Sequence, residues 1–416
     1  MALRRKRPHP HRGARRPRIM AVNLYHGGHH PQHLHSLLTH WEAHYADTEL
    51  HMVLSEAYRR EHPALLNAVD ASAGAHRHLV RTPALRVHRR GLFASDRTHG
   101  RVVSQWAEQI RADHVLLMYF DHVQLSLALN LRFAWPVNIS GIFFRPTFHY
   151  QELGMHLSFR EHIAAIRKEF VLASALRNPH LRYVFCFDPL AVERFAKFRT
   201  SATALTLPEP LYDPSPRAEE PPLLRSIEPG RRRLLMFGSL DERKGISPVL
   251  DALSLLSESD QSRLVLVLAG RLSDDERDRL LRRIQILRST SNVQIVVDDR
   301  YLEETEIQPL MRACDLVLLT YIRHVGSSGV LVRAARASVP VLSTAYGLLG
   351  VQVSQNRLGA IVDATSPVDI ASTLKEWLVD PNTIPFDRET ANVFANANTA
   401  DAFAQTILSQ LLEARS

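Results

Sequence analysis

Short apolar runs alternate with helical segments along most of the chain, and this pattern occurs twice. In the first half, strands are predicted at 18–25, 50–55, 114–120, 136–144 and 183–187. Helical periodicity follows at 32–45 and at 123–131. In the second half, strands are predicted at 233–237, 263–269, 293–297, 313–320, 339–343 and 358–362. Alternating strands and helices are typical of α/β proteins with parallel sheets covered on both faces.

A proline-rich segment separates the two repeats of this pattern. Residues 207–230 contain seven prolines, which exclude a long helix or a central strand. We therefore expect a stiff linker between two doubly wound, Rossmann-like domains at 19–206 and 231–390, with a ligand cleft between them at the strand ends. The last helix is predicted at about 399–412, in a C-terminal segment, 391–416, that is expected to pack back towards the N-terminal domain.

Charge is distributed unevenly along the 416 residues. The first 18 residues hold eight Lys and Arg and no acid, so the remaining 43 bases balance the 43 acids. Residues 1–18 are predicted to be a disordered basic tail, which either attracts anionic lipid or nucleic acid weakly or is a solvated extension. No stretch has the length of a membrane span, and Cys186 and Cys314 lie in apolar runs. These features predict a cytoplasmic protein, peripheral at the inner face of the membrane if the tail binds lipid.

Two glycine-containing loops in the second half carry the chemistry. The first, 237–245, reads FGSLDERKG, and it places Lys244 beside a helix N-terminus, where charge and backbone dipole can meet a diphosphate. The second, 324–329, reads HVGSSG and precedes another helix, so its amides can face an anion. An ordinary turn and a flexible loop are the alternatives. His324 is the only histidine of the second half.

Taken in order, these motifs resemble the donor domain of glycosyltransferase family 4, whose members are retaining enzymes with the GT-B fold. The resemblance spans residues 232–378. It rests on Gly238, Lys244-Gly245, 266–270, Cys314-Asp315-Leu316, Gly326-Ser327-Ser328-Gly329, Ala334-Ala335, Val339-Pro340-Val341, Gly347 and Gly359.

The resemblance implies a nucleotide-diphosphate-sugar donor, no metal and no other cofactor. The donor-binding residues that it implies are Gly27, Gly28, Gly238, Ser239, Lys244, Arg300, Tyr301, His324, Gly326, Ser327, Ser328, Gly329 and Arg333. Three positions depart from the family. Arg333 and Val325 stand where the family has glutamates, and Ser239 replaces a basic residue. Since a guanidinium cannot accept hydrogen bonds from ribose hydroxyls, we expect Arg333 to face phosphate.

Strand ends in the first half supply the candidates for contact with the transferred sugar and the acceptor. By the same resemblance, the catalytic candidates are Asp121, His122, Arg145 and His149, each of which could equally be a hydrogen-bonded loop residue. The histidines at 26, 29, 30, 33 and 35 suggest metal, but no carboxylate or cysteine nearby completes a ligand set, so no metal site is predicted.

The sequence thus predicts a glycosyltransferase that moves a sugar to a hydroxyl of a glycan, lipid or small-molecule acceptor with retention, in glycan or glycoconjugate synthesis. An inactive GT-B protein that binds a nucleotide sugar or a glycan is the alternative, because of Arg333. Nucleic-acid binding is a third hypothesis, but the absence of net charge on residues 19–416 argues against it.

Overall fold

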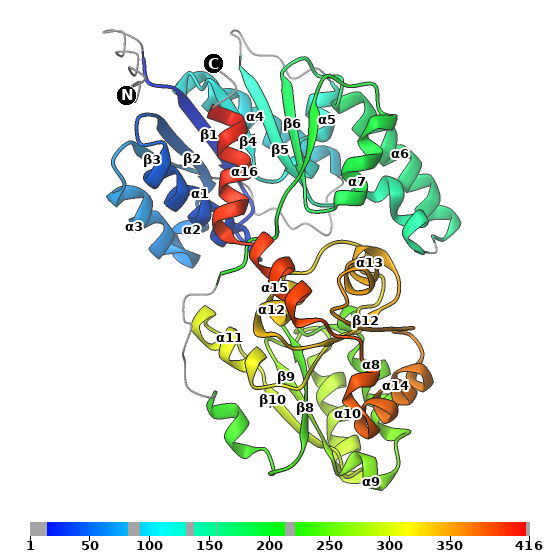
Figure 1. Ribbon diagram of the computed structural model, residues 1–416. Helices are drawn as coiled ribbons and strands as arrows, with labels where there is room; N and C mark the ends of the chain where they lie inside the picture. Colours follow the sequence, from blue (N-terminus) through cyan, green and yellow to red (C-terminus); the bar gives the residue numbers. More distant parts are fainter. Residues whose placement is uncertain (1–14, 82–91, 130–136, 156, 213–220, 413–416) are drawn as a thin grey trace, which may run out of the picture.

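Two parallel β-sheets, each with helices on both faces, form the two domains of the molecule (Figure 1). The computed structural model describes residues 15–81, 92–129, 137–155, 157–212 and 221–412. This architecture confirms the predicted α/β fold class with two doubly wound domains.

The N-terminal sheet has seven strands in the order β3-β2-β1-β4-β5-β6-β7. The strands are β1 (Arg18–Asn23), β2 (Glu49–Ser55), β3 (Ala75–Val80), β4 (His114–Leu117), β5 (Asn138–Phe143), β6 (Leu181–Cys186) and β7 (Thr203–Thr206). The apolar pattern predicts the five inner strands and misses β3 and β7. These two lie at the sheet edges and are half-exposed, so their sequences carry little of the apolar signal of a buried parallel strand.

Helices cover both faces of this sheet. They are α1 (His30–His44), α2 (Tyr58–Glu61), α3 (Pro63–Ala71), α4 (Leu92–Ile110), α5 (Gln124–Ala128), α6 (Phe159–Ala175) and α7 (Pro189–Arg194), with short 3-10 turns η1 (Phe120–His122), η2 (Thr147–Leu153) and η3 (Phe195–Lys197). One core joins the sheet to α1 and α3, and the other joins it to α4, α5, α6 and α7.

The C-terminal sheet has six strands in the order β10-β9-β8-β11-β12-β13, and all six are predicted. They are β8 (Arg232–Phe237), β9 (Leu264–Ala269), β10 (Gln294–Asp298), β11 (Leu316–Leu319), β12 (Val341–Thr344) and β13 (Gly359–Val362). The helical elements in this half of the chain are η4 (Pro222–Ser226), η5 (Glu242–Lys244), α8 (Ile246–Ser254), α9 (Glu258–Gln261), α10 (Arg277–Thr290), α11 (Glu304–Arg312), α12 (Gly329–Ala337), α13 (Gly347–Gln355), α14 (Pro367–Val379), η6 (Pro381–Thr383), α15 (Arg388–Ala397) and α16 (Ala400–Leu412).

The chain crosses between the domains at two neighbouring places. Leu211, on the first crossing, forms a parallel bridge with Thr399, on the second. The predicted last helix is observed as α16, and residues 388–397 form a separate helix, α15. Helix α15 packs in the core of the C-terminal domain, whereas α16 packs against α1 in the N-terminal domain (Figure 1). Of the proline-rich linker, residues 213–220 lie outside the described residues, and Leu224 is already part of the C-terminal core.

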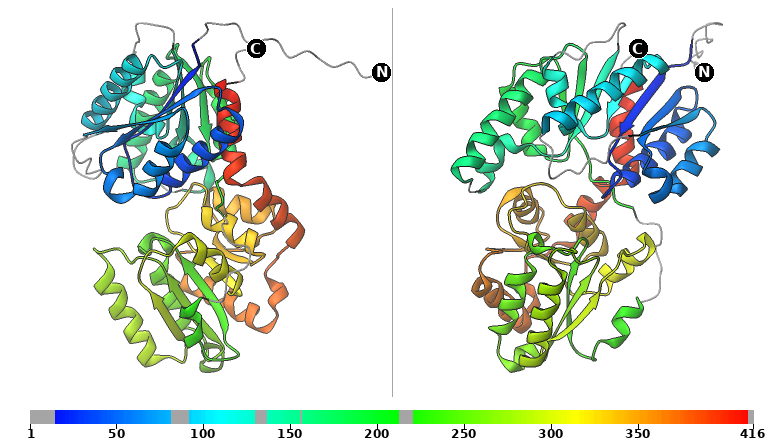
Figure 2. Two further views of the ribbon diagram at one scale, coloured as in Figure 1. Left: turned by 90° about the vertical axis from the view of Figure 1, so that its left-hand side faces the viewer. Right: turned by 180° about the vertical axis from the view of Figure 1, so that it is seen from behind.

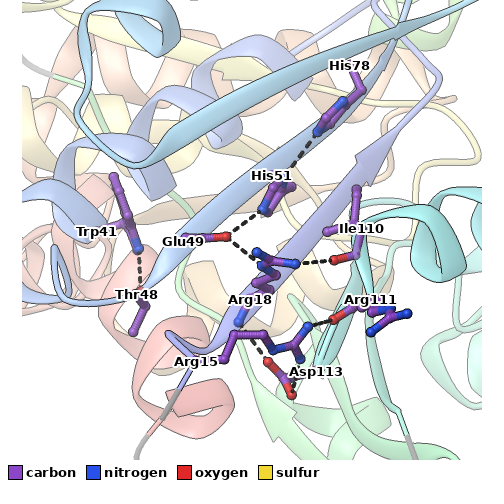
Figure 3. Close-up of polar contacts among 10 residues, drawn as sticks. All are labelled: Arg15, Arg18, Trp41, Thr48, Glu49, His51, His78, Ile110, Arg111 and Asp113. Carbon is purple, nitrogen blue, oxygen red and sulfur yellow. Dashed lines mark hydrogen bonds and ion pairs between the residues drawn. The ribbon is translucent and has the colours of Figure 1, made fainter. Parts of the chain in front are cut away.

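The predicted basic tail ends earlier than residue 18. Arg18 begins β1, and its guanidinium donates to Glu49 Oε2 at 2.6 Å and to the Ile110 carbonyl at 2.9 Å (Figure 3). Arg15 donates to Asp113 Oδ1 at 3.1 Å. Residues 15–18 are therefore held by the N-terminal domain, because acceptors at the amino ends of the strands pair with these bases. The rest of the tail, residues 1–14, lies outside the described residues.

Cys186 and Cys314 are buried and free, as their positions in apolar runs predict. Among the described residues, the helices are all too short or too polar to cross a lipid bilayer.

Candidate active site

The loop after β8 is shaped by two glycines with positive φ. Gly238 has φ +107°, and a side chain there would approach Lys244 Nζ to 3.5 Å. Gly245 has φ +75°, and a Cβ there would lie only 2.0 Å from the Thr320 carbonyl oxygen. Only glycine fits this close approach, so Gly245 holds the loop, and Lys244 with it, against the end of β11.

The ammonium group of Lys244 links this loop to the glycine-rich loop. Lys244 Nζ donates to Tyr321 Oη at 2.7 Å and lies 4.1 Å from the centre of that ring. Tyr321 Oη lies 3.5 Å from Ser328 Oγ, at the start of α12. Tyr321 lies in no motif, although its position two residues beyond β11 is a sequence signal that could have identified it.

Helix α12 begins at the predicted phosphate-binding loop. Ser328 is its N-cap, and the Ser328 side chain makes no capping hydrogen bond. Gly326 precedes the helix and Gly329 begins it, and in the described part of the chain a Cβ at either position would meet no non-adjacent residue closer than 4.0 Å. His324 Nε2 lies 3.0 Å from the Ser327 carbonyl oxygen. Burial lowers the pKa of His324, and the charge of Lys244 lowers it further, so a neutral imidazole lies beside the cation.

A carboxylate from the interdomain crossing lies at the same helix terminus. The Ser327 hydroxyl donates to Glu209, and a Cβ on Gly329 would lie 4.0 Å from Glu209 Oε2. Burial raises the pKa of Glu209, while the hydrogen bond from Ser327 acts in the opposite direction. An acidic side chain thus occupies a position where a helix N-terminus favours an anion, and the sequence pattern did not indicate it.

Arg333 lies on α12 but is engaged in an ion pair. Its guanidinium donates to Glu304 Oε2 at 2.7 Å and to the Tyr212 carbonyl at 3.2 Å. From α1, the Gln32 amide donates to Glu304 Oε1 at 3.4 Å. The expected phosphate-facing Arg333 is therefore instead part of a polar bridge between the domains.

The loop after β10 carries the residues predicted to lie near the nucleobase. Arg300 donates to both oxygens of Glu306, at 2.8 and 2.6 Å, so its charge is already paired. Tyr301 is 75% exposed, and the Arg271 guanidinium lies 5.7 Å from the centre of its ring. Ser239 is exposed on the first loop. The open ring of Tyr301 is the group here that is free to stack on a base.

The turn after β1 faces these groups from the N-terminal domain. Gly28 has φ +63°, and a Cβ on Gly27 would lie 2.9 Å from Tyr25 Oη. His29 follows and keeps exposed surface. Burial lowers the pKa of His29; the charges of Arg333 and Lys244 lower it further, whereas Glu304 raises it.

A pocket lies between the domains where these segments meet. It is lined by His29, Gln32, His33, Glu209, Pro210, Leu211, Tyr212, Glu304, Gly329, Val332 and Arg333. Three of these residues, His29, Glu209 and Glu304, bring titratable side chains to the pocket. Neither glutamate lies in a sequence motif.

Asp121 and His122 form part of η1, at the end of β4. Asp121 accepts the backbone N–H groups of Phe144 at 2.9 Å and Arg145 at 3.1 Å, which ties η1 to the end of β5. Burial raises the pKa of Asp121 to about 6. Burial lowers the pKa of His122 to about 3, and His122 Nδ1 is buried without a hydrogen-bond partner in the described part of the chain. His122 Nδ1 is therefore enclosed by the protein, and both Asp121 oxygens are occupied.

His149 is buried too deeply to contact the transferred sugar. Its side chain has no exposed surface, and His149 Nε2 is 2.9 Å from Asp188 Oδ2. Asp188 also accepts the Ala191 N–H at 3.1 Å, which caps α7. The structure thus gives His149 a place in the core that joins η2 to α7 rather than one at the cleft.

The histidines at 26–35 do not gather around one point. His30 and His33 pack among aromatic rings, and His33 lies 5.0 Å from Phe403 of α16 between ring centres. His26 lies 3.3 Å from Glu61 instead. The described residues that have metal-ligand spacing are His40, His44 and Asp401 in one group and Glu49, His51 and His76 in another.

Comparison with known proteins shows where this architecture occurs. Residues 225–401 match the family model of the glycosyl transferases group 1. No curated protein matches the sequence.

Solved structures match both domains together. The N-terminal domain of Candida albicans trehalose-6-phosphate phosphatase has a TM-score of 0.68 at 15% identity, over 96% of this chain and 97% of that one. Sucrose-phosphate synthase from Thermosynechococcus elongatus has a TM-score of 0.68 at 14% identity, over 96% and 100%. Anabaena HepE, in complex with UDP and glucose, has a TM-score of 0.63 at 16% identity, over 95% and 100%. At these identities the similarity shows the fold alone, which is the GT-B fold.

Proposed function

We propose that this chain, whose residues 225–401 match the family model of the glycosyl transferases group 1, transfers a sugar from a nucleotide-diphosphate donor to an acceptor hydroxyl with retention, in glycan or glycoconjugate synthesis. One observation carries the proposal. Lys244 and the N-terminus of α12 meet at the carboxyl ends of β8 and β11, linked through Tyr321. This is the edge of a parallel sheet at which doubly wound domains bind their ligands.

The main chemical task of such an enzyme is to stabilise the departing diphosphate. Lys244 supplies a point charge, and the first amides of α12 supply hydrogen bonds at the positive end of a helix dipole. The position of Lys244 is fixed by backbone geometry before any donor binds, because Gly245 admits no other residue. Little reorganisation is then needed when charge develops on the leaving oxygen.

The opposite wall of the cleft suits hydroxyl groups. His29, which lines the interdomain pocket, has a lowered pKa and presents a neutral imidazole, which can accept or donate hydrogen bonds without attracting the diphosphate. The Gly27-Gly28 turn provides backbone close to the C-terminal domain. In a retaining reaction the acceptor attacks from the side on which the diphosphate leaves, so we place the acceptor between this wall and Lys244.

Ligand binding by the purified chain and its Lys244→Ala variant tests the proposal. UDP is the first ligand to use, since the HepE structures hold UDP or UDP-glucose; GDP and ADP follow. Bound nucleotide should raise the melting temperature of the wild type, and Lys244→Ala should weaken binding by about tenfold or more. Arg243→Ala is the matched control, because Arg243 is exposed and pairs with Asp241. The proposal fails if no nucleotide binds, or if both variants bind like the wild type.

A catalytically inactive binder of nucleotide sugars is the second candidate function. The buried Arg333 and Val325 stand where the family has glutamates, and Arg333 is engaged with Glu304. The carboxylate that could hold a ribose is then Glu304 rather than a residue of α12. Incubation with UDP-sugars, followed by measurement of released UDP with and without acceptor glycans, separates the two functions. Binding without release of UDP would favour the inactive protein.

A further inference from the structure

Helix α6 exposes a continuous stripe of large apolar side chains. Phe159, Ile163, Ile166 and Phe170 have 79, 52, 56 and 74% of their surface exposed. Their spacing of four, three and four residues places them on one side of the helix. None of the other described helices carries more than two exposed large apolar residues. Single exposed apolar residues need no explanation, but a contiguous stripe indicates an interaction surface.

This stripe is not the face that holds α6 in the domain. Leu172 and Ala175 are buried in the N-terminal core, where α6 packs against α5. The helix begins with a complete capping box between Ser158 and Glu161, so its start is well defined. Helix α6 therefore has one apolar face that the fold uses and another that it leaves uncovered.

Basic side chains border the uncovered stripe. Arg160 and Arg167 are exposed on α6, each one residue from a member of the stripe. The two acids of the helix are each paired with a base from another element, Glu161 with Arg323 and Glu169 with Lys197. The surface around the stripe is therefore positively charged, and it is complementary to an anionic partner.

Helix α6 lies on the flank of the N-terminal domain, away from α16 (Figures 1 and 2). The first turn of α6 nevertheless touches the C-terminal domain through the ion pair between Glu161 and Arg323. A Cβ on Gly154, just before α6, would lie 3.3 Å from Tyr346 of the C-terminal domain. A partner that covers α6 would therefore also border the cleft between the domains.

We propose that this face of α6 is a membrane-docking surface, inserted into the headgroup region of a bilayer that contains anionic phospholipids. An amphipathic helix with large apolar residues on one side and Arg and Lys beside them binds lipid surfaces through apolar burial and charge attraction. The docking itself does not depend on sugar transfer. One part of the proposal rests on the proposed function, namely that docking brings an acceptor carried by the membrane to the cleft.

A second copy of the chain is the competing occupant. Two α6 faces packed together would bring Arg160 and Arg167 of one copy close to the same residues of the other. Such like-charge contact is unfavourable, so we favour the anionic lipid surface and leave self-association to be distinguished by experiment.

Co-sedimentation of the full chain with vesicles tests the docking surface. The wild type should sediment with vesicles of phosphatidylcholine mixed with phosphatidylglycerol, and much less with phosphatidylcholine alone. Phe159→Ser combined with Phe170→Ser should lower the partition coefficient by about tenfold or more, since both rings lose their apolar burial. Ile286→Ser combined with Val379→Ser is the matched control, because these residues are 61 and 79% exposed on α10 and α14.

Three results would overturn the proposal. They are a wild type that binds neither kind of vesicle, a Phe159/Phe170 variant that binds as tightly as the wild type, and a wild-type dimer that this variant dissociates. Circular dichroism and the UDP-dependent melting shift should be the same for all variants. If a variant no longer binds vesicles but still binds UDP, the result bears only on the docking surface of α6. If the wild type does not bind UDP, the result bears only on the proposed function.

Discussion

The two domains face each other with walls of different chemistry. The C-terminal wall carries the N-terminus of α12 and Lys244, whose loop is fixed by Gly245 in a conformation that other residues avoid. The N-terminal wall carries histidine and aromatic rings, and burial lowers the pKa of His29, His30 and His122. Lys244 and the helix N-terminus therefore come from one domain, and the neutral imidazole of His29 comes from the other.

Because of this difference, the phosphate-binding groups of the C-terminal wall are easier to predict from the sequence than the polar side chains of the N-terminal wall. A phosphate is recognised by backbone amides and a cation, and both require a particular local conformation that glycines reveal. Hydroxyl groups can be recognised by almost any polar side chain, and which one is used depends on what the fold places nearby. The predictions below test the backbone-built wall, the histidine-built wall and the contacts between them, in order of decreasing effect.

Gly245→Ala should be the most damaging single change. Its Cβ would meet the Thr320 carbonyl oxygen at 2.0 Å, and φ is +75°, so the backbone of the loop must move. We expect a loss of about 3 kcal/mol or more in the free energy of unfolding, together with loss of nucleotide binding. Gly230→Ala is the control, since Gly230 has φ +85° but nothing within 4 Å, and should cost about 1 kcal/mol. Urea denaturation measures both, and equal losses would contradict the argument.

Acid should destabilise the N-terminal domain before the C-terminal domain. Burial lowers the pKa of His30 to about 4 and that of His33 well below its usual value. The unfolded chain therefore binds more protons than the native chain below about pH 6.5, and stability falls as the pH decreases towards 4. His30 alone accounts for about 3 kcal/mol at the acid end. Asp121, with a pKa raised to about 6, acts in the opposite direction and removes part of this effect.

Hydrogen exchange at about pH 7.5 and about pH 5 distinguishes the domains. Amides of β1, β4 and β5 should lose protection at the lower pH, whereas those of β8, β9 and β11 should keep it. Equal loss in both sheets would show that the buried histidines do not set the acid stability.

Glu209→Gln should strengthen nucleotide binding by several-fold. The change removes a carboxylate from the N-terminus of α12 but keeps an oxygen that can accept the Ser327 hydroxyl. A diphosphate then meets one negative charge fewer at this site, and a gain of about 1 kcal/mol is the expected scale. Calorimetric titration with UDP measures it, with the exposed Glu228→Gln as control. Weaker binding in Glu209→Gln would mean that Glu209 supports the donor instead of competing with it.

Tyr301→Ala should have the smallest effect. The Tyr301 side chain is 75% exposed, so its removal should change the free energy of unfolding by less than about 0.5 kcal/mol. If its ring stacks on the nucleobase, binding of UDP should weaken by about 1 kcal/mol, whereas binding of inorganic diphosphate should not change. Leu255→Ala, at another exposed apolar position, is the control. An equal loss for UDP and diphosphate would place Tyr301 away from the base.

The sequence by itself determined the fold class, the six strands of the C-terminal sheet and the two loops that surround Lys244. These features depend on local rules, namely apolar runs in buried parallel strands and glycine where φ is positive. Edge strands β3 and β7 escaped the same rules, because a half-exposed strand lacks the apolar run.

Only the tertiary structure decided which side chains reach the cleft. Tyr321 meets Lys244, Glu209 meets Ser327, and Arg333 pairs with Glu304, in contacts that join segments 29 to 118 residues apart. Such contacts depend on how the sheets twist and how the two interdomain crossings set the domains against each other. No local pattern encodes that geometry, so the sequence could name the phosphate-binding backbone but could not foresee the side chains around it.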